Sequence, residues 1–165
     1  MKNTLIALVE DKPGVLTRVA SLFRRRNYNI ESLTVGHTEK LGMSRMTIVV
    51  DSTQTDAEKV VQNLYKLVNV IQVEDITEQP VVARDLALIK VRTEGGSTRS
   101  EVMQLVDTFR ARVVDVGVDS VMVEATGTED KIDGLAEVLK PYGILEMVRT
   151  GRVAMARGGA GNGHK

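Results

Sequence analysis

The chain has 165 residues, 42% hydrophobic and 27% charged, which is enough for one sizeable core or for two small ones of about 75–80 residues each. Basic and acidic residues balance at 22 each, so no overall field draws the chain to nucleic acid or to an anionic membrane surface. The absence of cysteine excludes disulfides, thiolate nucleophiles and cysteine-bound zinc. The start of the chain lacks a signal-peptide pattern and no run reaches the roughly 20 apolar residues of a membrane span, so a cytoplasmic protein is expected.

The first half of the chain predicts six elements in the order strand, helix, strand, strand, helix, strand. The strands are predicted at residues 4–9, 29–35, 43–50 and 70–73, and the helices at 15–26 and 57–64. The turn-forming residues 36–42 join the two middle strands as a hairpin loop. The first helix is expected to bury an apolar stripe made of Leu16, Val19, Ala20 and Phe23.

The second half of the chain repeats this order. Strands are predicted at residues 86–91, 113–116, 121–125 and 144–148, a turn at 95–97, and helices around Val102–Phe109 and Ile132–Leu139. The last helix is expected to stop at Pro141. A repeat of this size predicts an α+β protein made of two ferredoxin-like βαββαβ modules in tandem, each an antiparallel sheet with two helices on one face.

The boundary between the modules is predicted near Pro80, where the periodicity is lost. We expect a first module at residues 1–76, a linker at 77–84, a second module at 85–156 and a flexible glycine-rich tail at 157–165. Each sheet then has one face without helices, and an apolar patch on such a face usually marks association. A homodimer formed by side-by-side or face-to-face sheet contact is therefore expected.

The strongest candidate site is the turn between the first strand and the first helix, from Asp11 to Gly14. Asp11 can cap the helix or hold an ammonium group, and Gly14 lets a ligand approach the helix N-terminus, where free N–H groups favour a carboxylate. The same residues also fit an ordinary helix cap, and this alternative stays open. Asn29 offers an amide that suits an α-amino acid, although it is also a common turn residue.

No catalytic or metal-binding constellation emerges from the rest of the sequence. The run of arginines at 24–26 fits the negative end of its own helix dipole and needs no partner to explain it. His37 lies in the predicted hairpin loop without a second histidine or a paired acid at ligand spacing. The sequence therefore favours a module that binds a small zwitterion over an enzyme.

Four separated segments occur in an order that is typical of one known family. They are Phe23-Arg24-Arg25-Arg26, Asn29-Ile30-Glu31-Ser32-Leu33-Thr34-Val35, Ser44-Arg45-Met46-Thr47-Ile48-Val49 and Leu67-Val68-Asn69-Val70. With these segments the chain resembles the small regulatory subunit of acetohydroxyacid synthase, also called acetolactate synthase, and the resemblance extends more loosely to about Arg157. Residues 1 to about 76 resemble an ACT domain, a βαββαβ module that binds amino acids in metabolic regulators. Asp11 stands where this family usually has Asn, and Asn27 where it usually has Gly.

The resemblance implies a binding site for valine between two ACT modules. Carried over by position, the site comprises Asp11, Gly14, Val15 and Leu16 of one copy and Asn29 and Ile30 of the other. Backbone N–H groups would take the carboxylate, the polar groups of Asp11 and Asn29 the ammonium, and aliphatic neighbours the isopropyl group. An apolar pocket separates side chains that differ by one methylene by only about 1–3 kcal/mol, so the choice among valine, leucine and isoleucine stays open.

The resemblance also implies a partner. The chain is expected to bind the catalytic, or large, subunit of acetohydroxyacid synthase, to raise its activity and to transmit valine binding as feedback inhibition in branched-chain amino acid biosynthesis. Thiamine diphosphate, FAD and Mg²⁺ are expected on that subunit, and no cofactor or metal on this chain.

Two other classes of protein remain as alternatives. An amino-acid-responsive transcriptional regulator would use such a module, but the sequence shows no helix-turn-helix and no basic arm. A small amino-acid-processing enzyme would need a nucleophile or an acid–base pair, and the sequence offers none.

Overall fold

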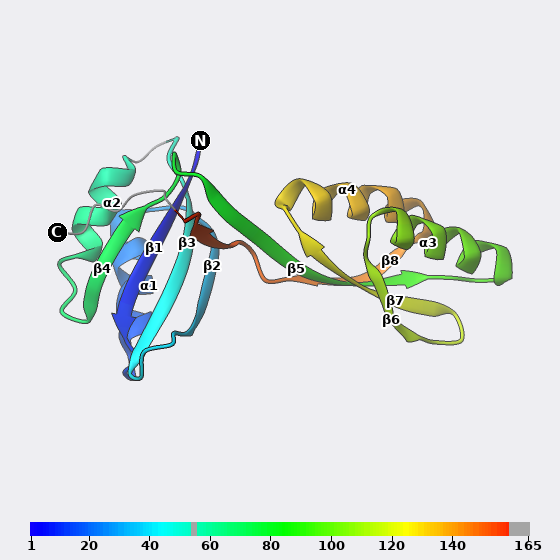
Figure 1. The fold of residues 1–165 in the computed structure, drawn as a ribbon, viewed down its shortest axis with the longest axis horizontal. Coiled ribbons are helices and arrows are strands. Elements are labelled where there is room, and N and C mark those ends of the chain that lie inside the picture. Colours follow the sequence, from blue (N-terminus) through cyan, green and yellow to red (C-terminus); the bar gives the residue numbers. More distant parts are fainter. Residues whose placement is uncertain (54–55, 159–165) are drawn as a thin grey trace. The chain divides into compact units, whose positions relative to one another are not determined.

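The computed structural model describes residues 1–53 and 56–158, which form two compact units (Figure 1). The first unit consists of Met1–Val82 together with the chain from Arg152 onward, and the second of Ala83–Gly151. Each unit holds an antiparallel sheet with two helices on one face. The predicted α+β fold with two βαββαβ modules is therefore confirmed.

The first unit follows the predicted order of elements closely. Its elements are β1 (Lys2–Glu10), α1 (Val15–Arg26), β2 (Ile30–His37), β3 (Met43–Asp51), α2 (Ala57–Leu64) and β4 (Val70–Asp75). The strand order is β2-β3-β1-β4, with β2 and β4 at the edges. Strands β1 and β3 pair over their whole length, from Lys2 opposite Asp51 to Glu10 opposite Met43. This register places the start of α1 and the β2–β3 hairpin loop at the same end of the sheet.

Helix α1 buries a different stripe from the predicted one. Val19 and Phe23 are buried as expected, but Leu16 is 48% exposed and Ala20 is also exposed. Val15 and Leu22 are buried in their place. The two sets fit the helical period equally well in sequence, and only the packing of the helix against the sheet decides between them. The prediction for Leu16 and Ala20 was wrong, and Leu16 is left free to contact something else.

The face of the first sheet that points away from the helices is covered by the chain itself. A short strand, β9 (Val153–Ala156), follows the second unit but lies with the first. Arg152 Nη1 donates to Thr4 Oγ1 at 2.8 Å, and Arg45 Nη2 donates to the Ala154 carbonyl at 2.9 Å. Both Thr4 and Arg45 alternate with core residues along their strands, so β9 crosses the side of the sheet opposite the helices.

The compact units have other bounds than the predicted modules. Residues 152–156 were expected in the second module, but the hydrogen bonds to Thr4 and Arg45 place them with the first unit. Strand β9 also pairs with β5 (Val81–Arg92), which begins in the first unit and continues into the second. Part of the expected linker, residues 81–84, is already the beginning of strand β5. The predicted tail at 157–165 falls largely on residues 159–165, which lie outside the described part of the chain.

The second unit repeats the architecture of the first. Besides β5 it contains α3 (Gly96–Thr108), β6 (Arg112–Val116), β7 (Ser120–Gly127), α4 (Glu129–Leu139), a 3₁₀ turn (Lys140–Tyr142) and β8 (Ile144–Arg149). Its strand order is β6-β7-β5-β8, apart from the pairing of β9 with β5. Val102 and Val106 of α3 and Ile132, Leu135 and Leu139 of α4 are buried in the core of the unit, and α4 ends next to Pro141 as expected. Helix α3 begins at Gly96, inside the stretch predicted as a turn.

Candidate functional site

The turn between β1 and α1, residues 11–14, leaves the N-terminus of helix α1 open. Gly14 immediately precedes the helix with a φ of 84°, a conformation that glycine adopts without strain. Within the described residues, no side chain caps this helix, and its first turn carries no acidic residue. The first N–H groups of a helix have no partner inside the helix, and together with the helix dipole they favour an anion. The β1–α1 turn therefore presents backbone donors toward whatever lies in front of it.

Asp11 does not act as the cap of helix α1. Its backbone N–H donates to the Gly42 carbonyl at 2.8 Å, which ties the β1–α1 turn to the β2–β3 hairpin loop. Its carboxylate lies 3.2 Å from Nδ1 of His37, at the end of β2. The ordinary-cap alternative from the sequence is therefore wrong for Asp11, and the carboxylate is directed toward the hairpin side of the turn.

His37 is the residue beside this site that the sequence analysis missed. It was placed in a polar loop without a paired acid, because Asp11 is far away in sequence. The β1–β3 and β2–β3 registers bring the last residues of β1 and β2 to the same end of the sheet, since Glu10 pairs with Met43 and His37 with Ser44. A full register prediction for the three strands would have found the pair.

Glu10, the last residue of β1, anchors the other side of the β1–α1 turn. Its Oε2 lies 2.6 Å from Nζ of Lys12 and accepts a hydrogen bond from Nδ2 of Asn69 at 3.3 Å. The hydrogen bond from Lys12, followed by the one from Asn69, lowers the pKa of Glu10 below its ordinary value of 4.5. The carboxylate is thus held in its charged form at the base of the turn.

The lowered pKa of Glu10 predicts a pH dependence of stability. A carboxyl group whose pKa is lower in the folded state than in the unfolded chain stabilises the fold above the unfolded pKa, and this contribution is lost as the pH falls through the folded value. We expect the melting temperature of the Glu10→Gln variant to fall less between pH 6 and pH 3 than that of the wild type, as measured by circular dichroism. The Lys12→Met variant should show a reduced fall as well, and an unchanged pH profile in both variants would contradict the assignment.

The remaining predicted site residues divide between the two ends of the sheet. Val15 is buried in the core and Leu16 is exposed beside Gly14. Asn29 directly precedes Ile30, which pairs with Val50, and Val50 pairs in turn with Asn3 of β1. The seven residue steps from Asn3 to Glu10 span roughly 24 Å of extended chain.

One copy of the chain therefore does not bring the predicted site together. The group formed by Asp11, Gly14 and Leu16 and the group formed by Asn29 and Ile30 lie too far apart for one α-amino acid to touch both. An effector that contacts both groups would therefore need residues from two copies of the chain.

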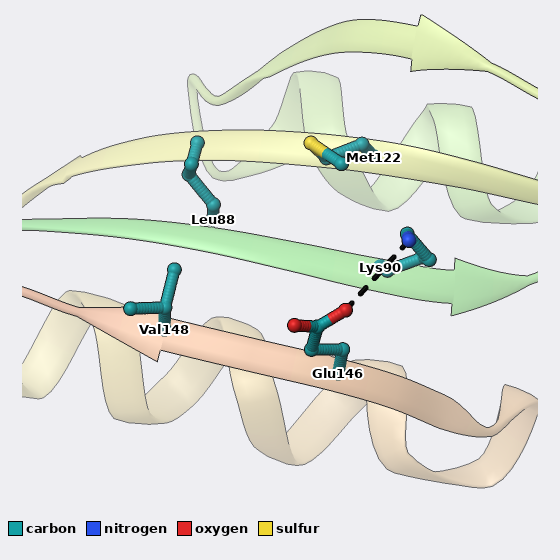
Figure 2. A pocket seen from close by; sticks show the side chains of 5 residues that line it. All are labelled: Leu88, Lys90, Met122, Glu146 and Val148. Carbon is teal, nitrogen blue, oxygen red and sulfur yellow. Dashed lines mark ion pairs between the residues drawn. The ribbon is translucent and has the colours of Figure 1, made fainter.

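A pocket on the second unit is lined by none of these residues. Figure 2 shows its lining side chains on the sheet face away from the helices: Leu88, Lys90, Met122, Glu146 and Val148. Nζ of Lys90 lies 3.7 Å from Oε2 of Glu146, so the two charges in the pocket are opposite and paired. This face of the second sheet is one of the uncovered faces expected from the sequence.

In residues 1–53 and 56–158, no three or more metal-ligating side chains gather in one place. In the same ranges, no helix is both long enough and apolar enough to cross a membrane.

Comparisons with known proteins cover nearly the whole chain. Residues 5–72 match the model of the AHAS small subunit-like ACT domain, and residues 84–158 match the model of the small subunit of acetolactate synthase. The acetolactate synthase small subunit of Mycobacterium leprae (strain TN) is 54% identical over 161 residues, which cover 98% of this chain and 95% of that protein. The one from Bacillus subtilis (strain 168) is 50% identical over 159 residues, or 96% of this chain and 92% of that protein.

A solved structure agrees with these matches. The crystal structure of the acetolactate synthase small subunit from Thermotoga maritima superimposes with a TM-score of 0.87 at 38% sequence identity, covering 95% of this chain and 98% of that one. The first unit is thus an ACT domain, followed by a second ferredoxin-like unit. The chain belongs to the acetolactate synthase small subunit family.

Proposed function

We propose that the chain is a regulatory subunit that activates the catalytic subunit of acetolactate synthase and makes it sensitive to valine, in the biosynthesis of valine, isoleucine and leucine. The family supports a regulatory role and a catalytic partner. The single observation that supports an amino-acid effector is the uncapped N-terminus of helix α1 behind Gly14. A carboxylate bound there would accept hydrogen bonds from the free backbone N–H groups and would lie at the positive end of the helix dipole.

The effector site is proposed to lie between two copies of the ACT domain. Strand β2 is an edge of the first sheet, and two such edges placed side by side in opposite directions would bring Asn29 of one copy toward the β1–α1 turn of the other. The carboxylate of valine would then lie on helix α1, its ammonium group near Asp11 and the partner's Asn29, and its isopropyl group against Leu16 and the partner's Ile30. Homodimerisation is part of this proposal because neither copy holds the whole site.

The regulation follows from the position of the site. An effector bound between two copies favours one relative orientation of them, and a catalytic subunit that contacts both copies would respond to that orientation. A coupling free energy of about 1–3 kcal/mol changes an affinity or an equilibrium roughly 5–150-fold, which is sufficient for feedback inhibition. The chain itself is proposed to be non-catalytic and cytoplasmic, with thiamine diphosphate, FAD and Mg²⁺ on the catalytic subunit.

Reconstitution tests this function. The purified chain is mixed with the acetolactate synthase catalytic subunit, and acetolactate formation is measured with and without valine, leucine and isoleucine. We expect the chain to raise the activity several-fold and valine to reduce that gain, while the catalytic subunit alone responds weakly. Activation without any response to the three amino acids would contradict the effector site, and the absence of activation would contradict the regulatory function.

A further inference from the structure

We propose that Asn69 is a positioning residue that fixes the β1–α1 turn for effector binding, an inference that rests on the function proposed above. Asn69 lies in the connection between α2 and β4 and is only 6% exposed. Its side chain uses both ends of its amide: Oδ1 accepts from Nη1 of Arg18 at 2.6 Å, and Nδ2 donates to Oε2 of Glu10 at 3.3 Å. Its carbonyl also accepts from the Glu10 N–H at 2.9 Å.

These three bonds span the two sides of the β1–α1 turn. Glu10 precedes the turn at the end of β1, and Arg18 follows it in the first turns of helix α1. One buried side chain therefore sets the distance between the strand end and the helix N-terminus, where the free N–H groups lie. The N–H of Arg18 donates to the Gly14 carbonyl at 3.0 Å. Asn69 is therefore connected through Arg18 to Gly14, the residue directly before helix α1.

The connection that carries Asn69 is itself rigidly attached. Backbone N–H groups of Lys66, Leu67 and Val70 donate to carbonyls within the same connection or at the end of α2, at 3.1–3.2 Å. A displacement of α2 against β1 would thus be passed through Asn69 to the β1–α1 turn. The side-chain hydrogen bonds of Asn69 go to Glu10 and Arg18 and not to a position assigned to the effector, so its proposed action runs through those two residues.

Two variants test the anchor, each with the full-length chain. Asn69→Leu keeps the approximate size of the side chain and removes both side-chain hydrogen bonds, and Arg18→Met removes one of them from an exposed position. We expect the valine dissociation constant, measured by calorimetry, to rise at least about 10-fold in Asn69→Leu and about 3–10-fold in Arg18→Met. Without these hydrogen bonds, the backbone N–H groups at the start of helix α1 are no longer held in place before valine binds. The double variant should be close to Asn69→Leu alone, because both changes break the same contact.

Asn63→Leu is the matched control. Asn63 is another buried asparagine of the same unit, 8% exposed, whose Nδ2 donates to the Tyr28 hydroxyl and the Lys59 carbonyl, each at 2.8 Å. It should lose a similar amount of thermal stability with an unchanged valine dissociation constant. In the reconstituted enzyme, Asn69→Leu should activate like the wild type while requiring more valine for inhibition.

The outcomes separate the anchor from the proposed function. If the wild type binds valine and Arg18→Met and Asn69→Leu bind it equally well, the role of Asn69 is wrong and the proposed function stands. If Asn69→Leu fails to fold, Arg18→Met decides alone, since its side chain is exposed. A wild type that binds none of the three branched-chain amino acids contradicts the proposed function itself.

Discussion

Replacing Gly14 by aspartate is expected to abolish valine inhibition while leaving activation of the catalytic subunit intact. A Cβ at this position meets no atom within 4 Å, so the cost of the substitution comes from the positive φ of 84° and not from a clash of the Cβ. The introduced carboxylate would cap the open N-terminus of helix α1, occupy the donors that the effector needs and repel the effector's own carboxylate. Loss of charge-assisted hydrogen bonds worth about 3 kcal/mol corresponds to about a 100-fold rise in the valine concentration for half inhibition.

Gly14→Ala is the matched control for that substitution. Both variants place a side chain at a φ of 84°, which costs about 1–2 kcal/mol, so both should lose a similar amount of stability. Alanine has no oxygen to cap the helix and should retain most of the valine sensitivity in the reconstituted assay. Full sensitivity of Gly14→Asp, or equal losses in both variants, would show that the helix N-terminus does not bind the carboxylate.

Ala154→Glu is expected to detach strand β9 from the first unit and to destabilise that unit by about 3 kcal/mol or more. Ala154 is 2% exposed against the sheet face that also buries Ile6, Thr47 and Val49. Burying a carboxylate without a partner costs more free energy than packing β9 on the sheet provides. When the strand detaches, apolar side chains become exposed, and the burial of each contributes about 1.5–3 kcal/mol to stability. The melting temperature measured by scanning calorimetry should fall by about 10 °C or more.

The neighbouring position supplies the control for β9. Met155 lies in the same strand, 63% exposed, so Met155→Glu adds the same charge on the solvent side. Its melting temperature should stay within about 2 °C of the wild type, as is usual for surface substitutions. Equal effects at the two positions would mean that β9 does not cover the sheet.

The fold was largely predictable because the spacing of apolar residues along the chain indicates most of its strands and helices. Strand and helix runs of the first unit agree with the structure to within a few residues, and helix α1 has the predicted bounds. The choice of Leu16 over Val15 for the core was wrong because both fit one helical period. Strand β9 was missed because this segment is held by Arg45, which bonds Ala154, and by Thr4, which bonds the preceding Arg152, and both partners are more than 100 residues away in sequence.

The candidate site was predictable only in part, for a related reason. The β1–α1 turn can be predicted from Pro13 and Gly14, because these turn-forming residues lie within the turn itself. The pairing of Asp11 with His37 and the anchoring of the turn by Asn69 depend on strand register and on the α2–β4 connection. The amide of Asn29 made it a candidate from sequence, but its place opposite the turn of a second copy came from the family resemblance, and no described contact of a single copy brings it near the turn.

A mixed dimer tests the central claim, that the effector site is shared between two copies. Gly14→Asp and Asn29→Ala each damage one half of the site, and each homodimer should respond to valine weakly or not at all. The two variants, carrying different affinity tags, are co-expressed, and the mixed dimer is purified and titrated with valine. We expect one restored site with near wild-type affinity per mixed dimer, because one turn and one Asn29 remain intact opposite each other. A mixed dimer as insensitive as its parents, or a chain that purifies strictly as a monomer, would contradict it.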